Sequence, residues 1–541
     1  ALRLEYFSTL HGQDGEPYRG WSTNFRKSLD ISPSLDECTL RWNRYRGVKF
    51  VRVGSSPANP QLDEYQTENP YFQFDRLLRD TVTGAWTYRA KTGETIQFSS
   101  DGQAVRETDR NGFSLDYAPY PGTNLLHTVT EPISGAALTF FWGTSASGEP
   151  QLERVEDSAG RSLSFAASGD FLEAISLSTA SAALIQDNGG TGDSFYRRFT
   201  YDSAGRIRTC YDREDRTIFE NTYNDQGQVL SQKDGKGQET TFAYTVLTDP
   251  ASLQGQDRFT TPTFHTLVTH RNNTTQEFRS NLYFQLLEVT KGDGQKVAFD
   301  YDARGLPAKL INERGGITTL AYDSNGFLDA LTDPKGGAWD YDHDADGDLL
   351  RLENPNGGVS TRTYDPARNL IQTMQDEAGR TFTFTYDPDG LLETTGLPNG
   401  QTVLFDHSAG RLVQVNEPDG ESMTYGYNGW GLVSSVTNEP GFATRFTYDL
   451  RGRVTTVLDE TAHPVFRQFY DSRGLPTTFT DRYGEQYTYT YDPNGNLQHI
   501  IHPLDGQMLL AYDSMDRLER VESFEGRELS YSYDNANRIE S

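Results

Sequence analysis

The chain has 541 residues, 35% of them hydrophobic, and its 77 Asp and Glu against 49 Lys and Arg give a formal net charge of −28. A surface this acidic repels phosphate backbones, so we expect no nucleic-acid partner. No stretch approaches 18 apolar residues, which excludes a membrane-spanning helix. The opening ALRLEYFSTL lacks a basic segment followed by an apolar run, so we expect no signal peptide in this chain.

Residues 1–90 are predicted to form a β segment that precedes a repeat array, with a turn containing Trp21. Residues 91–194 contain degenerate repeats, such as VEDSAGRSLSF, which keeps Asp-x-x-Gly without a tyrosine. Their last part, 176–194, is rich in small residues and glycine and is predicted to be a loop.

Residues 195–541 contain a clear repeat, whose signature is a Tyr-Asp pair. From Tyr301 onward the register recurs at intervals of 19 to 23 residues, and a weaker copy appears at Tyr201 and Tyr223. The positions that keep this register are Tyr301, Tyr322, Tyr341, Tyr364, Tyr386, Phe405, Tyr427, Tyr448, Tyr470, Tyr491, Tyr512 and Tyr533. A fixed period of this kind indicates a repeat architecture.

Each repeat is predicted to be a β-hairpin. Tyr487, Tyr489 and Tyr491 alternate, which places them on one face of a strand. Asp492-x-x-Gly495 follows, where the aspartate bonds its own backbone two residues on and the glycine accepts a positive φ. Apolar residues three apart after the turn favour a β-bulge there. We therefore expect an all-β chain of tandem hairpins in one long antiparallel sheet, with the tyrosines of the Tyr-Asp pairs stacked as a ladder between successive repeats.

Two departures interrupt the array. Residues 245–280 break the period and are predicted to be an insertion, which in repeat proteins lies on one face and can bind a partner. The array ends within a repeat, at YSYDNANRIES, so we expect the chain to be truncated at its C-terminal end.

These motifs resemble the Rhs/YD-repeat family, which includes shells of bacterial polymorphic toxins, the C component of insecticidal toxin complexes, and teneurins. The shared pattern is Y-D-x-x-G-x-[LVI], seen as YDSAGRI, YDSNGFL, YDPDGLL, YDLRGRV and YDPNGNL. Leu4–Phe25 resembles the segment that precedes the repeats, with Gly20, Trp21 and Asn24 matching its turn and Phe7 and Ser8 matching its strand loosely. The resemblance implies a sheet that coils into a hollow shell, secreted or displayed at the cell surface.

The resemblance also implies a structural function, in which the shell encloses or presents a polypeptide cargo such as a C-terminal toxin missing from this chain. The alternative is an extracellular adhesion module that binds a surface glycan or a protein. The acidic charge admits a cationic cargo as well as simple solubility. The sequence contains no G-x-S-x-G and no H-E-x-x-H, and Cys38 and Cys210 form no metal motif, so we expect no enzyme and no cofactor.

One local motif allows two interpretations. DHDADGDLLRLE fits a calcium loop, with Asp342, Asp344, Asp346, Asp348 and Glu353 as the oxygen ligands. The same residues also fit an ordinary repeat turn, because Asp342 belongs to a Tyr-Asp pair and no helical pattern flanks the loop. The sequence leaves both open.

Overall fold

The computed structural model describes residues 3–6, 21–25, 27–42, 46–179, 196–439, 441–504, 506–535 and 537–541. The predicted matches at Phe7, Ser8 and Gly20 lie outside these residues, as does most of the predicted loop at 176–194. The first residues of that loop, up to Thr179, belong to a strand.

The described chain is almost entirely β-structure, as predicted. Its helical segments are η2 (Pro250–Ser252) and α2 (Asp257–Thr260), both within the connection 247–263. This connection holds the extra length of the segment predicted as an insertion, whose remaining residues are strands. Within the described residues, no helix has the length and apolar content needed to cross a membrane.

Two short strands stand apart from the main sheet. They are β1 (Leu4–Tyr6) and β2 (Trp21–Thr23), which pair only with each other, antiparallel.

The other 45 strands form one antiparallel sheet in which every strand pairs with the next in sequence. The strands before the Tyr-Asp array are β3 (Ser28–Ile31), β4 (Glu37–Arg41), β5 (Gly47–Ser56), β6 (Asn59–Gln66), β7 (Arg76–Asp80), β8 (Trp86–Arg89), β9 (Thr95–Phe98), β10 (Ala104–Thr108), β11 (Ser114–Pro119), β12 (Leu126–Thr130), β13 (Ala137–Thr144), β14 (Pro150–Asp157), β15 (Arg161–Ser168) and β16 (Phe171–Thr179).

The first half of the array contains β17 (Tyr196–Tyr201), β18 (Ile207–Tyr211), β19 (Thr217–Tyr223), β20 (Val229–Asp234), β21 (Glu239–Val246), β22 (Phe264–Thr269), β23 (Thr275–Ser280), β24 (Leu286–Thr290), β25 (Lys296–Tyr301), β26 (Pro307–Ile311), β27 (Ile317–Tyr322), β28 (Leu328–Thr332), β29 (Ala338–His343), β30 (Leu349–Glu353), β31 (Val359–Tyr364) and β32 (Ile371–Gln375).

The second half contains β33 (Thr381–Tyr386), β34 (Leu392–Gly396), β35 (Thr402–Ser408), β36 (Arg411–Asn416), β37 (Ser422–Tyr427), β38 (Val433–Asn438), β39 (Ala443–Tyr448), β40 (Val454–Leu458), β41 (Pro464–Tyr470), β42 (Pro476–Asp481), β43 (Gln486–Tyr491), β44 (Leu497–His502), β45 (Gly506–Tyr512), β46 (Leu518–Glu522) and β47 (Glu528–Ser530).

The predicted bulge is present in the repeats. In the pair β33–β34, Thr385 opposes Thr394 but the next residue, Tyr386, opposes Leu392, so Glu393 is the extra residue. The same shift occurs next to Tyr322, Tyr448 and other tyrosines of the register. A bulge increases local strand twist, so its repetition bends the sheet in one sense along the array.

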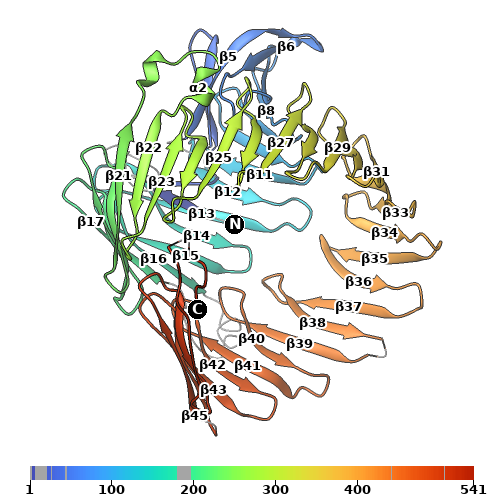
Figure 1. Ribbon diagram of the computed structural model, residues 1–541. Coiled ribbons are helices and arrows are strands. Elements are labelled where there is room, and N and C mark those ends of the chain that lie inside the picture. Colours follow the sequence, from blue (N-terminus) through green and yellow to red (C-terminus); the bar gives the residue numbers. More distant parts are fainter. Residues whose placement is uncertain are drawn as a thin grey trace.

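The sheet coils, and its coil is open at both ends. Figure 1 shows it winding from β5 through β11–β25 and onward through the yellow, orange and red strands to β45. Among the described residues no pairing joins β47 to β3, and β3 meets the turn before β10 through a single bridge between Ser28 and Gln103. The predicted shell-like sheet is confirmed.

Apolar packing is concentrated in the N-terminal part. Of the 30 buried apolar side chains among the described residues, 24 lie at or before Cys210. They form two cores, one inside β3–β9 around Phe50 and Trp86, and one where Trp21 and Phe25 pack against β11–β18. The rest of the array is a single-layer wall, which explains the low hydrophobic content of the chain.

Candidate functional site

The aspartate of each repeat turn holds the turn with its own carboxylate. Oδ1 of Asp387 accepts hydrogen bonds from the backbone N–H groups of Asp389 and Leu391, each over 2.9 Å. The N–H of Gly390 donates to the Asp387 carbonyl over 2.9 Å, and Gly390 has a φ of 87°. Glycine adopts this left-handed conformation without strain, so both predicted roles in the turn are confirmed.

The tyrosine of each pair joins its repeat to the preceding one. The hydroxyl of Tyr448 donates to the carbonyl of Val433 over 2.6 Å, and that of Tyr386 donates to Ile371 over 2.8 Å. The acceptor in each case is the apolar residue that ends the motif in the repeat before. The same bond is made by Tyr301, Tyr364, Tyr427 and Tyr533.

An arginine of the preceding turn covers several of these tyrosine rings. Arg453 lies 4.1 Å from the ring centroid of Tyr470, and its Nε donates to Asp449 of its own turn over 2.7 Å. Arg517 relates in the same way to Tyr533, at 4.4 Å. The predicted ladder of stacked tyrosines is not formed, since no ring contact joins successive Tyr-Asp tyrosines in the part of the chain that is described.

The coil brings together hairpin turns that are far apart in the sequence. Their polar side chains meet along a line of contacts that we call the seam, with partners separated by 190 to 280 residues. Along the seam lie the hydrogen-bonded pairs Asn111–Asn369, Glu214–Ser472, Asp234–Asn494 and Asp293–Arg538. Each pair ties one pass of the coil to the next.

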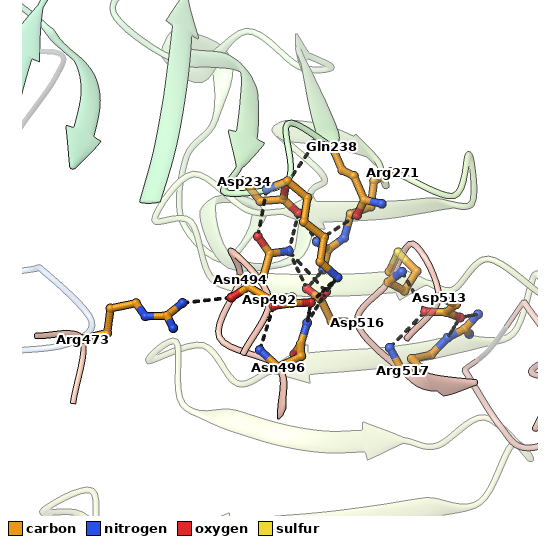
Figure 2. A network of polar contacts seen from close by, with 12 residues as sticks. Asp234, Gln238, Arg271, Arg473, Asp492, Asn494, Asn496, Asp513, Asp516 and Arg517 are labelled. Atoms are coloured by element: carbon orange, nitrogen blue, oxygen red, sulfur yellow. Dashed lines mark hydrogen bonds and ion pairs between the residues drawn. The ribbon is translucent and has the colours of Figure 1, made fainter. Parts of the chain in front are cut away.

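The densest junction of the seam joins the turns after β20 and β22 to the turns after β43 and β45 (Figure 2). Nζ of Lys236 contacts Oδ2 of Asp492 at 2.6 Å and Oδ1 of Asp516 at 2.9 Å. Nη2 of Arg271 reaches Oδ2 of Asp516 at 2.6 Å. Nδ2 of Asn494 donates to Oδ2 of Asp234 over 2.8 Å. Two cations and three carboxylates thus form one network.

The charges of this network are held in their ionised states. Burial disfavours the ammonium of Lys236, but its hydrogen bonds to Asp492 and Asp516 outweigh burial and raise its pKa. Burial also opposes ionisation of Asp492, yet the hydrogen bonds from Lys236 and Asn496 lower the pKa of that carboxyl. The pKa of Asp516 is lowered in the same way. The network is therefore a set of ion pairs at neutral pH.

A glycine permits the close approach at this junction. A Cβ atom at Gly235 would lie 2.8 Å from the carbonyl oxygen of Pro493 and 2.9 Å from that of Thr217. Both are backbone atoms, which cannot move aside as a flexible side chain can. A pocket of about 560 Å³ opens beside the junction, with a polar lining that includes Arg197, Arg271 and Asp516.

The segment predicted as an insertion also contributes to the seam. Phe259 of α2 is 5% exposed, and its ring stacks on Tyr283 at 5.3 Å. The adjacent Arg258 pairs with Glu68 of the earlier pass at 3.2 Å. The connection 247–263 therefore packs against other parts of this chain and helps to join two passes of the coil.

Three of the residues predicted to bind calcium belong to the seam and its turns. Oδ1 of Asp344 accepts from the N–H groups of Asp346 and Asp348, each over 2.9 Å, and so caps a repeat turn. Asp346 forms an ion pair with Arg89, and Asp348 forms one with Arg110 of the earlier pass. Asp348 is 3% exposed and its Oδ2 has no hydrogen-bond partner; burial raises its pKa.

The other two predicted ligands lie on strands outside this turn. Asp342 of β29 opposes Arg351, whose Nη1 is 3.7 Å from Oδ2 of Asp342, and Glu353 also pairs with Arg351. No group of three or more His, Cys, Asp or Glu side chains suited to a metal ion occurs in the described part of the chain. The five residues are thus not gathered around one point, and calcium binding stays a prediction. Cys38 and Cys210 are free and buried.

Two family models match the repeats. The teneurin YD-shell model matches residues 296–487, and the RHS repeat model matches residues 470–507. Residues 296–507 therefore resemble the repeats of the Rhs/YD-repeat family. These models describe a shell-type structural module, which agrees with the coiled single-layer wall.

Individual proteins and solved structures are also similar to this chain. It is 31% and 30% identical over 140 residues to two proteins of Dickeya dadantii (strain 3937), named probable deoxyribonuclease RhsB and RhsA. Each match covers 26% of this chain and 9% of the relative. The solved structure of TcdB2-TccC3 shares the fold, with a TM-score of 0.56 and 12% identity over 95% of this chain and 32% of that one. The chain thus spans a small part of the proteins it matches.

Proposed function

We propose that this chain is a structural shell that encloses or presents a polypeptide cargo and has no catalytic role of its own. The observation that carries the proposal is the continuity of the wall. Every strand from β3 to β47 is paired with its sequence neighbours, and the seam joins successive passes at hairpin tips. A wall whose described strands are all paired with their sequence neighbours, and whose passes are tied together at the seam, suits containment.

The chemistry of the seam supports a structural role. Its carboxylates are neutralised by Lys236, Arg271 and Arg110, so they are occupied as partners of cations. The deoxyribonuclease activity in the names of the Dickeya proteins refers to whole chains of which the match covers 9%. We assign such an activity to parts outside the match, and we propose a secreted or surface-displayed protein in keeping with the family.

Limited proteolysis of the natural gene product tests this function. Any segment of that product outside residues 1–541 is followed by mass spectrometry during digestion, in the full protein and when expressed alone. We expect cleavage to be slow in the full protein and fast in the isolated segment. Cleavage at equal rates would contradict containment and leave the adhesion module as the better interpretation.

A variant of the seam sharpens the test. Replacing Arg271 by Ala and Asp516 by Asn removes the cross-pass ion pairs of Asp516 with Arg271 and Lys236. Asn tolerates the φ of 60° at position 516, so the repeat turn is kept. We expect the cargo segment to become more sensitive to protease in this variant. A matched variant at Arg106 and Asp116, an ion pair between neighbouring strands β10 and β11, should leave cleavage unchanged.

A further inference from the structure

One face of the repeat sheet carries apolar side chains from strand to strand, with polar ones such as Arg362 between them. Residues directly opposite on neighbouring strands share a face, as do residues two apart on one strand. Leu320 opposes Leu331, Phe446 opposes Val457, and Tyr489 opposes Ile500. Following these registers from strand to strand keeps the row on the same face from β17 to β47. We call it the apolar face.

The apolar face is left half-covered through most of the array. The side chains of the row are half-buried, and Leu310 and Met423 within it are 37% and 40% exposed. Large exposed apolar surfaces on soluble proteins often mark a binding site. Among the described residues, the wall formed by residues 286–522 has a single layer and no second layer of sheet over this face.

At one place the chain itself covers the apolar face. Phe199 stands two residues before Tyr201, as Phe446 stands before Tyr448, and Trp21 of the separate strand β2 packs edge-on against Phe199 with ring centroids 5.3 Å apart. Trp21 is 6% exposed. Under this cover Ile207 falls to 4% exposure, whereas Val454, its counterpart in a later repeat, stays half-buried.

The tyrosine hydroxyl completes this contact. Tyr201 donates to the carbonyl of Leu172 over 2.6 Å and accepts from Nε1 of Trp21 at 3.3 Å. Tyr448 donates to the Val433 carbonyl in the same way. Among the hydrogen bonds of the described residues, no donor reaches the hydroxyl oxygen of Tyr448. This oxygen can therefore accept a hydrogen bond from an incoming N–H group.

We propose that the apolar face of residues 286–522 binds an extended polypeptide whose aromatic side chains, tryptophan above all, insert as Trp21 does against Phe199. The proposal rests on the proposed shell function and names the chemistry of its cargo. The backbone groups of the sheet are used in strand pairing, so the occupant binds through side chains and adds no strand to the sheet. A tryptophan ring buries a large apolar area and offers an N–H donor, which fits both the row and the hydroxyls.

Apolar contact and charge attraction differ in how the charge of the guest and the salt concentration affect binding. The net charge of −28 favours a cationic guest, whereas an apolar contact is indifferent to the charge of the guest and is strengthened by salts that are excluded from surfaces. An unfolded acidic protein is therefore a discriminating probe, because it can bind only if apolar contacts outweigh repulsion.

The experiment measures binding of fluorescently labelled, reduced and carboxymethylated α-lactalbumin to the intact chain by anisotropy. The test variant is Leu310→Glu with Met423→Glu, two exposed positions on the apolar face. The matched control is Ile317→Glu with Leu404→Glu, which are 47% and 45% exposed. Ile317 opposes Ile311 and Leu404 opposes Asn416, so both project from the other face and carry the same added charge.

We expect the wild-type chain and the control to bind the probe, undiminished by added sodium sulfate, and the test variant to bind about tenfold more weakly or worse. Equal binding by both variants, or no binding by the wild type, would overturn the proposal. Thermal unfolding of both variants checks that each is folded. Proteolysis of the natural gene product carrying each variant distinguishes the two claims: if its cargo stays protected while the probe fails to bind, the shell function stands and the apolar contact does not.

Discussion

Asn494 and Asp234 lie 260 residues apart in the sequence, and Nδ2 of Asn494 donates to Oδ2 of Asp234 over 2.8 Å. Both residues belong to hairpin turns whose local structure is the same throughout the array. Turns that look equivalent in the sequence therefore differ in function, because some only reverse the chain while others also join two passes of the coil.

Replacing Asp492 by Ala should separate these two functions. Asp492 is 4% exposed, and its carboxylate accepts from the Asn496 backbone and contacts Lys236. Removal leaves a partly buried ammonium with one partner fewer, so we expect a loss of about 2–4 kcal/mol in the free energy of unfolding. Denaturant unfolding followed by circular dichroism measures it.

The matched control is Asp387→Ala. Asp387 caps its turn in the same way but has no contact to another pass in the described chain. We expect it to cost about 1 kcal/mol, the magnitude known for capping side chains at helix ends. Equal losses for the two variants would show that the seam adds nothing to stability.

Gly235→Ala tests the close approach of two passes. The added Cβ would lie within 3 Å of two backbone carbonyl oxygens, so we expect a loss of about 1–3 kcal/mol through overpacking. Gly429→Ala is the control, because no atom lies within 4 Å of the position of its Cβ. Differential scanning calorimetry should show a lower Tm for the first variant only.

Tyr448→Phe tests the bond between successive repeats. It keeps the ring and removes the donor to the Val433 carbonyl, so we expect a loss of about 1 kcal/mol. Tyr483→Phe changes the same group at a position that is 83% exposed and should be neutral. An unchanged stability in Tyr448→Phe would mean that water replaces the hydroxyl at no cost.

The pH dependence of the seam follows from the pKa of Asp516, which is lowered from its ordinary 3.8. A carboxyl with a lowered pKa contributes stability above its ordinary pKa and loses that contribution as the pH falls through the lowered value. The Tm of Asp516→Asn should therefore lie below that of the wild type at neutral pH, and the two should converge as the pH falls below 3.8. A constant difference down to the lowest pH would contradict the ion-pair assignment.

Calcium should leave the Tm unchanged. Asp346 and Asp348 are already paired with Arg89 and Arg110, and Asp344 is engaged by two backbone N–H groups. An ion that bound the folded chain alone would raise the Tm with its concentration. A calcium-dependent rise that disappears in Asp344→Asn would establish the calcium loop instead.

The turn, strand and bulge of each repeat could be predicted because short sequence motifs determine them. Asp-x-x-Gly fixes the turn, alternation fixes the strand, and the three-residue apolar spacing indicates the bulge. The seam could not be predicted, because the partners of Lys236 depend on how many hairpins complete one pass. That number is set by the accumulated twist of the sheet, which no single repeat encodes. The prediction that the tyrosines stack between repeats was wrong for a similar reason. A common period does not determine whether a tyrosine ring stacks on the next ring or its hydroxyl bonds a backbone carbonyl of the preceding repeat.

The pairing of turns along the seam fixes which hairpin of one pass meets which hairpin of the next. In a straight stack of repeats, losing one unit shortens the stack and leaves every other contact intact. Here the loss of one hairpin between Asp234 and Asn494 would carry each later turn past its partner by a whole repeat. The gain or loss of a single repeat, a simple change for a gene with tandem repeats, is therefore expected to break seam contacts and destabilise this array. Variation in length has to occur in connections such as 247–263, or as whole passes of the coil.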